Sequence, residues 1–299
     1  MLLRVENVHF KYPGGPEVLK GASFWVDKGE VVTIAGSNGS GKTTLLLVAA
    51  GLLEPQKGAI LLGEKPLKEQ LPEARRRMGL VFQDPNDQLF NPTVYDEVAF
   101  ALRQLLSSEG EVEKKVLGIS EMFNLTDLLS RSSYRLSFGE KRRVTFASIL
   151  AYDPDVLFLD EPTANLSFRS IEEIERVIGD AKAAGKAVLI ASHDVEFVAK
   201  VSDRVYIIND GSMLGGSDTK SMLSDDSLLG IADMKPPLVL QTLKVLGLEL
   251  KGNPLTIKDL AELAEVTHTV DNHQVRIEDE KDPKKKGSSF SKYLLKAPG

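Results

Sequence analysis

The sequence contains no cysteine among its 299 residues. This absence excludes disulfide bonds, zinc sites built on thiolates, iron–sulfur clusters and a cysteine nucleophile. Long apolar runs are also missing, because the longest, residues 45–53, is interrupted by Gly51 and has about half the length of a bilayer span. We therefore expect a chain that is soluble by itself and that reaches a membrane only through a partner protein.

Basic residues are outnumbered by acidic ones. Lys and Arg together number 37, against 43 Asp and Glu, which gives a net charge of −6. Proteins that bind a nucleic-acid duplex usually carry a basic surplus, so this composition disfavours nucleic acid as a main partner. Hydrophobic residues make up 42% of the chain and charged residues 27%, which is ordinary for a globular protein with a sizeable core.

Short apolar runs alternate with helical patterns along the first two thirds of the chain. Residues 31–35 are β-branched or small and apolar throughout, as in a buried parallel strand. Further strands are expected at 2–10, 18–26, 78–82, 156–159, 187–191 and 205–208. Helical composition or spacing marks residues 43–53, 94–105 and 171–184. Buried strands that alternate with helices predict an α/β fold with a mostly parallel sheet.

The composition changes around Gly215. Residues 218–266 have helical patterns, with one helix at 238–248 and another at 257–266 after a capping box of Thr256 and Asp259. One more strand is expected at 270–277, followed by a mobile tail at 279–299. The lysines at 284–286 are interpreted as a solvated part of this tail, with contact to anionic lipid as the alternative.

Residues 36–43 match the pattern G-x-x-x-x-G-K-[ST] in full, between an apolar strand and a helix. The glycines allow successive backbone N–H groups to point at phosphate oxygens, and the helix N-terminus adds positive potential. Lys42 is expected to reach the β- and γ-phosphates of a nucleotide, and Thr43 to ligate Mg²⁺. The residues expected to hold the nucleotide here are Gly36, Ser37, Asn38, Gly39, Ser40, Gly41, Lys42, Thr43 and Thr44.

The apolar strand at 156–159 is followed directly by two adjacent carboxylates, Asp160 and Glu161. Two acids at the end of a buried strand are costly unless they face a cation or water. Asp160 is expected to hold Mg²⁺ through water, and Glu161 to orient and deprotonate an attacking water molecule. Acids also end many strands in ordinary turns, but the phosphate-binding loop upstream favours the catalytic interpretation.

Five motifs occur in a fixed order: the phosphate-binding loop, Gln83 after an apolar strand, Leu136-Ser137-x-Gly139, Asp160-Glu161-Pro-Thr, and Ser-His193-Asp. This order resembles that of ABC-transporter ATPases and covers about residues 2–215. The resemblance implies the P-loop NTPase fold of that family, with a mostly parallel core sheet, an antiparallel N-terminal β subdomain and a helical signature subdomain at about 84–150. We assign 1–215 to this cassette and 216–278 to a small C-terminal extension.

The resemblance also implies roles for individual residues. Tyr12 would stack on adenine; the alternative is a half-buried aromatic at a sheet edge. Gln83 would sense Mg²⁺ and the γ-phosphate, and His193 would contact the γ-phosphate; with Glu161 they form the expected catalytic set. Ser137 and Gly139 would close over ATP bound to a second subunit, identical or different, so the resemblance implies a dimer.

Residues 81–90 and 93–100 narrow the resemblance to the ATPases of energy-coupling-factor importers, which take up cobalt, nickel or vitamins. In that group this region meets a transmembrane coupling subunit, so candidate contacts are Tyr95, Asp96, Glu97 and Phe100. The alternative is a packed helix whose acids are solvated. A separate membrane protein would bind the solute, and this chain would lie peripherally on the cytoplasmic face of the cell membrane, where it would power import by ATP hydrolysis.

Three positions depart from the family pattern. Phe138 replaces a glycine of Leu-Ser-Gly-Gly-Gln, Glu140 replaces its Gln, and Ser167 stands where an Asp is usual. These positions serve the partner's nucleotide, so the site that Phe138 completes is expected to hydrolyse slowly. A weakly hydrolytic regulatory subunit is therefore an alternative. A non-transport ABC ATPase is disfavoured, because the sequence has one phosphate-binding loop and no sustained heptad stretch.

Overall fold

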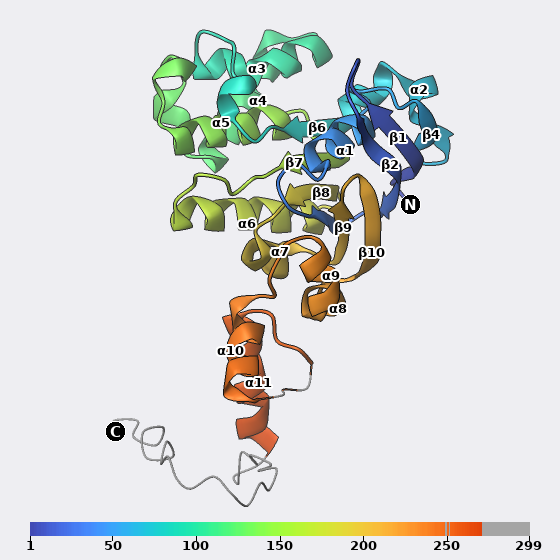
Figure 1. Cartoon of the computed structure of the whole chain (residues 1–299). Coiled ribbons are helices and arrows are strands. Elements are labelled where there is room, and N and C mark those ends of the chain that lie inside the picture. Colours follow the sequence, from blue (N-terminus) through green and yellow to red (C-terminus); the bar gives the residue numbers. More distant parts are fainter. Residues whose placement is uncertain (249, 251, 271–299) are drawn as a thin grey trace, which may run out of the picture. The chain divides into compact units, whose positions relative to one another are not determined.

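The computed structural model describes residues 1–248, 250 and 252–270 (Figure 1). Residues 1–260 form one compact unit, and a second unit begins at Ala261. The strand expected at 270–277 lies outside the described residues except for Val270, the last residue of helix α11 (Ile257–Val270). The expected tail at 279–299 also lies outside them. In the described part of the chain, no helix has both the length and the apolar character to cross a membrane.

A six-stranded sheet forms the centre of the first unit, in the order β10-β9-β3-β8-β7-β6. Its strands are β3 (Val31–Ala35), β6 (Met78–Val81), β7 (Val156–Asp160), β8 (Ala187–Ser192), β9 (Arg204–Asn209) and β10 (Ser212–Asp218). Only the edge strand β10 pairs antiparallel. Every residue of β3, β7 and β8 is buried, as expected for strands covered on both faces. The predicted mostly parallel core is confirmed.

Alternate residues of the central strands pack into two different hydrophobic clusters. Val156 and Phe158 of β7 pack with helix α1 (Lys42–Ala49) and the N-terminal sheet. Leu157 and Leu159 pack with the helices on the other face. Those helices are α3 (Val94–Leu105), α4 (Glu109–Met122), α5 (Phe138–Leu150) and α6 (Phe168–Ala183). The helix expected over 43–53 ends at Ala49, because Gly51 adopts a left-handed φ of 70° and turns the chain.

The N-terminal sheet is antiparallel, as expected, with the order β2-β1-β4-β5 (Figure 1). It contains β1 (Leu3–Lys11), β2 (Glu17–Val26), β4 (Lys57–Leu62) and β5 (Lys65–Pro66), of which the sequence pattern did not indicate the last two. Trp25 of β2 forms the joint with the central sheet. The Arg204 guanidinium lies 4.6 Å from the centre of the Trp25 ring, and the Tyr206 ring lies 6.0 Å from it.

The C-terminal segment of the first unit packs onto the central sheet. It contains α8 (Thr219–Ser224), α9 (Asp226–Ile231) and α10 (Leu238–Leu246), and the start of α11. Val205 and Ile207 of β9 share a hydrophobic cluster with Leu223, Leu229 and Leu240 of these helices. The boundary expected at residue 215 falls inside β10, and packing continues across it. The division into cassette and extension therefore remains a prediction from sequence.

The predicted capping box at the start of α11 is present. The Asp259 amide donates to Thr256 Oγ1 at 3.1 Å, and the Thr256 amide donates to Asp259 Oδ2 at 3.0 Å. These two bonds satisfy amide groups that have no partner within the helix. Burial raises the pKa of Asp259, but the hydrogen bonds that its carboxylate accepts from the Leu255 and Thr256 amides contribute to a net lowering of this pKa.

Candidate nucleotide-binding site

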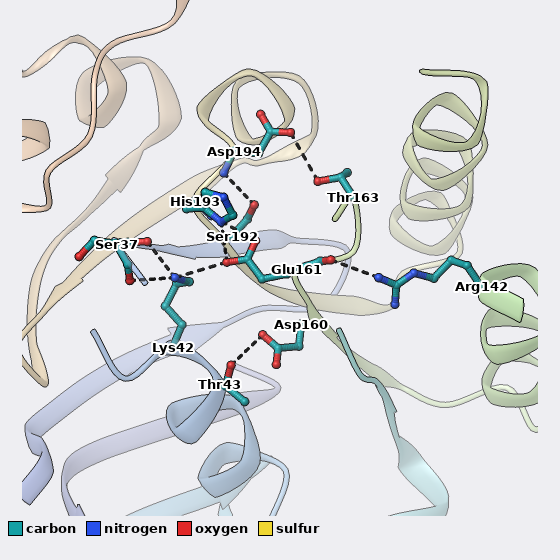
Figure 2. Close-up of polar contacts among 11 residues, drawn as sticks. Ser37, Lys42, Thr43, Arg142, Asp160, Glu161, Thr163, Ser192, His193 and Asp194 are labelled. Carbon is teal, nitrogen blue, oxygen red and sulfur yellow. Dashed lines mark hydrogen bonds and ion pairs between the residues drawn. The ribbon is translucent and has the colours of Figure 1, made fainter. Parts of the chain in front are cut away.

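The carboxyl ends of three parallel strands meet at one edge of the central sheet. Ala35 at the end of β3 pairs with Ser192 of β8, and Asp160 at the end of β7 pairs with Ala191 of β8. This register places the loop after β3, the two acids at the end of β7 and His193 after β8 side by side (Figure 2). Ligands bind at this edge in open α/β sheets.

The loop between β3 and α1 passes close to its surroundings at Gly36. A Cβ at this position would lie 2.4 Å from the Ile208 carbonyl oxygen, so only glycine fits. Gly41 caps α1 with a left-handed φ of 108° and offers no side chain to its first turn. Ser40 Oγ is buried and has no hydrogen-bond partner among the residues that the structure describes. The loop thus has an unused buried donor and a helix N-terminus, which suit an anion.

Lys42 is buried, and its ammonium group has three oxygen partners (Figure 2). Nζ donates to the carbonyl oxygens of Gly36 and Ser37 at 2.8 and 3.0 Å. It also lies 3.3 Å from Glu161 Oε1, and both side chains are only 6% exposed. A buried charge requires such partners, because desolvation of an ion is costly. The structure therefore brings together the two residues that the sequence assigned to phosphate binding and to catalysis.

Glu161 is held at two points by His193. The His193 ring nitrogen Nδ1 lies 2.9 Å from Glu161 Oε1, and the His193 amide donates to Oε2 at 3.4 Å. The His193 side chain is half exposed, whereas the Glu161 carboxylate is buried. Glu161 also has a positive φ of 41°, which is uncommon for a residue other than glycine. Strained backbone of this kind is frequent at functional sites.

Asp160 lies beside the first turn of α1. Its Oδ1 accepts a hydrogen bond from Thr43 Oγ1 at 3.1 Å. Burial raises the pKa of Asp160, and the charge of Glu161 adds to this effect, while the Thr43 bond and the charges of Lys42 and Arg142 oppose it. A hydroxyl and a carboxylate oxygen are ligands that Mg²⁺ prefers, and a cation would relieve the buried negative charge. The residues present therefore fit a magnesium ion.

Arg142 of α5 is a site residue that the sequence interpretation missed. Its guanidinium donates to the carbonyl oxygens of Phe82, Gln83 and Glu161. Burial lowers its pKa to about 10, against the charges of Asp84 and Asp160. A signal was available, because Arg142 lies four residues before Phe146 and therefore on the same buried face of α5. The side chain of Gln83 itself is exposed.

Tyr12 follows β1 and lies next to the first turn of α1. Its hydroxyl is 3.3 Å from Thr44 Oγ1, and its ring packs edge-to-face against Phe10 with centroids 4.9 Å apart. The side chain is 41% exposed. Tyr12 therefore presents part of its ring beside the phosphate-binding loop. This position accommodates both interpretations of the residue, as an adenine contact and as an edge aromatic.

Ser137 and Gly139 lie away from Lys42, at the start of α5. Ser137 Oγ donates to Glu140 Oε2 at 2.7 Å and accepts from the Glu140 amide at 3.3 Å. The hydrogen bonds from Ser137 lower the pKa of Glu140. Glu140 thus completes a capping box. A cavity of about 380 Å³ adjoins this turn and is lined by Ser137, Gly139, Glu140, Arg143, Asn165, Leu166, Ser167 and Ser170.

The residues of α3 expected at a partner surface differ in their exposure. Glu97 is 5% exposed, and its carboxylate accepts from the amide and the side chain of Asn91. Burial raises its pKa. The prediction of Glu97 as a surface contact is wrong, because the helix turns this acid inward. Asp96 accepts from Thr93 and Arg103, which lower its pKa, and remains partly exposed.

An exposed group of aromatic side chains lies close to the loop after β6. Phe90 and Phe100 pack edge-to-face with centroids 4.9 Å apart, and they are 58% and 46% exposed. The Tyr134 hydroxyl donates to the Phe90 carbonyl at 3.2 Å. We call Phe90, Phe100 and Tyr134 the aromatic patch. Of these three residues, the sequence interpretation assigned only Phe100 to a partner surface.

The fold and the site define a class of protein. A glycine-rich loop leads from a buried strand into a helix, and acids at the end of a neighbouring parallel strand face its lysine. This is the arrangement of P-loop nucleoside-triphosphate-binding proteins.

Comparison with known proteins agrees with this class. The ABC transporter family matches residues 19–164. The energy-coupling factor transporter ATP-binding protein EcfA of Methanocaldococcus jannaschii is 38% identical over 249 residues, which cover 82% of this chain and 89% of the relative. The cobalt import ATP-binding protein CbiO of Rhodobacter capsulatus is 39% identical over 242 residues, which cover 80% of this chain and 86% of the relative.

A solved structure has the same fold. The structure of cbiO1 from Clostridium perfringens, described as part of the ABC transporter complex cbiONQ, matches with a TM-score of 0.69 and 30% identity. The match covers 88% of this chain and 98% of that protein. The chain belongs to the ABC transporter ATP-binding family, as its order of motifs predicted.

The raised pKa of Asp160 predicts that Asp160→Asn stabilises the protein in buffer without divalent cations. The folded state holds a proton on Asp160 more readily than the unfolded chain, so its ionised form destabilises the fold at neutral pH. We expect the variant to melt roughly 2–4 °C higher at pH 7. This gain should shrink as the pH falls through the raised pKa toward the ordinary value of 3.8. Thermal unfolding followed by circular dichroism measures it, and equal melting at pH 7 would contradict it.

Proposed function

We propose that this chain is the ATP-hydrolysing subunit of an energy-coupling-factor type importer of a metal ion or a vitamin. The observation that carries the proposal is the buried contact between Lys42 and Glu161, which is completed by His193. The names of the relatives support the link to transport. The chain would lie peripherally on the cytoplasmic face of the membrane, with a second ATPase subunit and a transmembrane coupling subunit as partners.

Each of the side chains at the strand ends has its own role in ATP hydrolysis. Lys42 exchanges its contacts with the Gly36 and Ser37 carbonyls for phosphate oxygens. Mg²⁺, when bound beside Thr43 and Asp160, neutralises charge on the phosphates. Glu161 accepts a proton from the attacking water, while His193 holds its carboxylate in place. Gln83 would help to hold the metal ion and the γ-phosphate, and Tyr12 would pack on the adenine.

The face around Ser137 and Gly139 serves the ATP of the partner subunit. Its cavity is lined by Ser137, Gly139 and Ser167. Closure of two subunits on two ATP molecules then drives the conformational change for transport, and ATP hydrolysis lets the dimer reopen. Product release and reopening are steps that commonly limit turnover in such enzymes.

Replacement of the catalytic carboxylate separates hydrolysis from binding. Glu161→Gln removes the proton acceptor and should lower turnover at least about 100-fold. It keeps the size of the side chain, so binding of a fluorescent ATP analogue should change less than about threefold. The measurement is steady-state phosphate release by the chain alone and together with candidate partner ATPases. Equal turnover of both proteins would contradict the role of Glu161.

ATP turnover by the unmodified chain distinguishes a heterodimer from a regulatory subunit. Turnover only in a mixture with another ATPase would indicate a heterodimer with one efficient site. ATP binding without turnover in any assembly would favour a regulatory subunit. Phe138 and Ser167 favour the regulatory subunit, because both depart from the family pattern on the face that serves the partner's ATP.

Phe138 is the first residue of α5 and stands beside Ser137. We expect its ring to crowd the partner's nucleotide, so Phe138→Gly and Phe138→Ala should both speed hydrolysis at the site that this face completes. We expect a gain of at least about threefold, which corresponds to a barrier lower by at least about 0.65 kcal/mol. Single-turnover rates of the assembled dimer measure it. Unchanged rates in both variants would show that the ring does not slow the reaction.

The aromatic patch is the proposed docking surface for the transmembrane coupling subunit. Exposed aromatic side chains commonly provide most of the binding energy at protein interfaces. The double variant Phe90→Ala, Phe100→Ala should abolish stimulation of ATP hydrolysis by that subunit in proteoliposomes, and it should leave ATP binding unchanged. Met122→Ala is a matched control, because Met122 is a 68% exposed apolar residue at the end of α4. Full stimulation of the double variant would contradict this assignment.

A further inference from the structure

Arg142 is a buried cation that is held by backbone carbonyls. It is 2% exposed and is among the largest fully buried side chains of the described residues. Within the part of the chain that the structure describes, no carboxylate forms an ion pair with it, although Asp84 and Asp160 contribute favourable charge. A buried guanidinium is costly unless its hydrogen bonds are satisfied. The two terminal nitrogens of Arg142 donate to backbone carbonyls, whereas its buried Nε has no partner among the described residues, so the loss of any of these carbonyls would leave still more of the cation unsatisfied.

These carbonyls belong to two different loops. Arg142 donates to the Phe82 carbonyl at 2.5 Å and to the Gln83 carbonyl at 2.9 Å, both after β6. It donates to the Glu161 carbonyl at 3.2 Å, after β7. The planar guanidinium, with its five donors in a fixed geometry, is the side chain best suited to join several acceptors at once. One side chain of α5 thus joins the backbones of Gln83 and Glu161, and Figure 2 shows its contact with Glu161.

The backbone of Glu161 depends on such support. Its φ of 41° lies in the left-handed region, which is unfavourable for a residue with a Cβ. The Glu161 carbonyl accepts from Arg142 and, at 3.1 Å, from the Ala164 amide, while the Glu161 amide donates to the Ala191 carbonyl at 2.9 Å. Without the Arg142 contact, the strained Glu161 backbone loses one of its hydrogen bonds. The Glu161 carboxylate then changes position, because its place depends on that backbone.

The same helix begins at the face that serves the partner's ATP. Ser137 caps α5, and Arg142 lies five residues further along it, about 7–8 Å along the helix axis. A shift of α5 at Ser137 therefore moves the group that holds Gln83 and Glu161. Helices transmit such shifts as rigid elements.

We propose that Arg142 is a positioning residue that couples the two ATP sites of the dimer. Contact of Ser137 and Gly139 with the partner's ATP moves α5, and Arg142 carries this movement to Gln83 and Glu161 of the chain's own site. This coupling role rests on the proposed function, because it requires a dimer that binds two ATP molecules. The positioning role itself can be tested on the purified chain without any hydrolysis.

Amide hydrogen exchange, followed by mass spectrometry, provides this test. Arg142→Gln should raise exchange about tenfold or more in peptides from 82–90 and from 161–167. Both peptides contain amides that are now hydrogen bonded, such as those of Leu89 and Ala164. Exchange in the phosphate-binding loop, 36–44, should stay unchanged. A rise confined to one loop, a uniform rise across the chain or no rise at all would overturn the proposal.

Two further variants keep this test decisive. Arg77→Gln is the matched control, because Arg77 also bridges two segments through Asp155 at 2.6 Å but contacts neither loop; it should leave both peptides unchanged. Arg142→Lys keeps the charge but replaces the planar group by one nitrogen. If Arg142→Gln fails to fold, Arg142→Lys should still raise exchange in one or both loops by a smaller factor, and wild-type exchange in both would overturn the proposal.

Turnover measurements test the consequence for catalysis. In a dimer that hydrolyses ATP, Arg142→Gln should lower kcat at least about tenfold and change the Kd for ATP less than twofold, because Arg142 does not contact the phosphate-binding loop. Wild-type kcat in this variant would overturn the proposal. If the unmodified chain hydrolyses no ATP in any assembly, the proposed function fails, while the exchange experiment still decides the positioning role of Arg142.

Discussion

The parallel register of β3, β7 and β8 is the constraint on which the whole site depends. Ala35 pairs with Ser192 and Asp160 pairs with Ala191, so three loops leave the sheet at the same level. A shift of one residue between two of these strands would turn their side chains to the opposite faces. The alternation of β7 between two hydrophobic clusters fixes this register, because each face buries its own set of residues.

Charge balance is the second organising feature of the site. Two acids, Asp160 and Glu161, lie near two buried cations, Lys42 and Arg142. Lys42 is paired with an acid, whereas Arg142 is held by carbonyls. Burial is the main cause of the raised pKa of Asp160, and the charge of Glu161 adds to it, at the place where a magnesium ion fits. The protein thus keeps part of its negative charge unneutralised, at some cost to its stability, where a cation is required for phosphate chemistry.

The sequence was most informative where chemistry depends on local order. The phosphate-binding loop, the paired acids and the parallel strands could be predicted because each is a contiguous pattern with a physical cause. Arg142 and Glu97 were misjudged, because a charged side chain on a helix is normally solvated. The four-residue spacing between Arg142 and Phe146 indicated a buried face, but the hydrogen-bond partners that make burial of either charge possible lie outside the helix. Strands β4 and β5 were missed for a similar reason, since the pairing of β4 with β1 and of β5 with β4 decides their structure more than their composition does.

The joint between the two sheets has a practical consequence. Trp25 is the single tryptophan of the chain, and it lies between Arg204 and Tyr206 where the antiparallel sheet meets the central one. A nearby cation and phenol change the fluorescence emission of an indole ring, so the intrinsic tryptophan fluorescence of this protein reports on the surroundings of Trp25. That place joins the sheet that bears Tyr12 to the sheet that bears Asp160. The protein therefore contains a built-in optical probe of the relative motion of its two sheets.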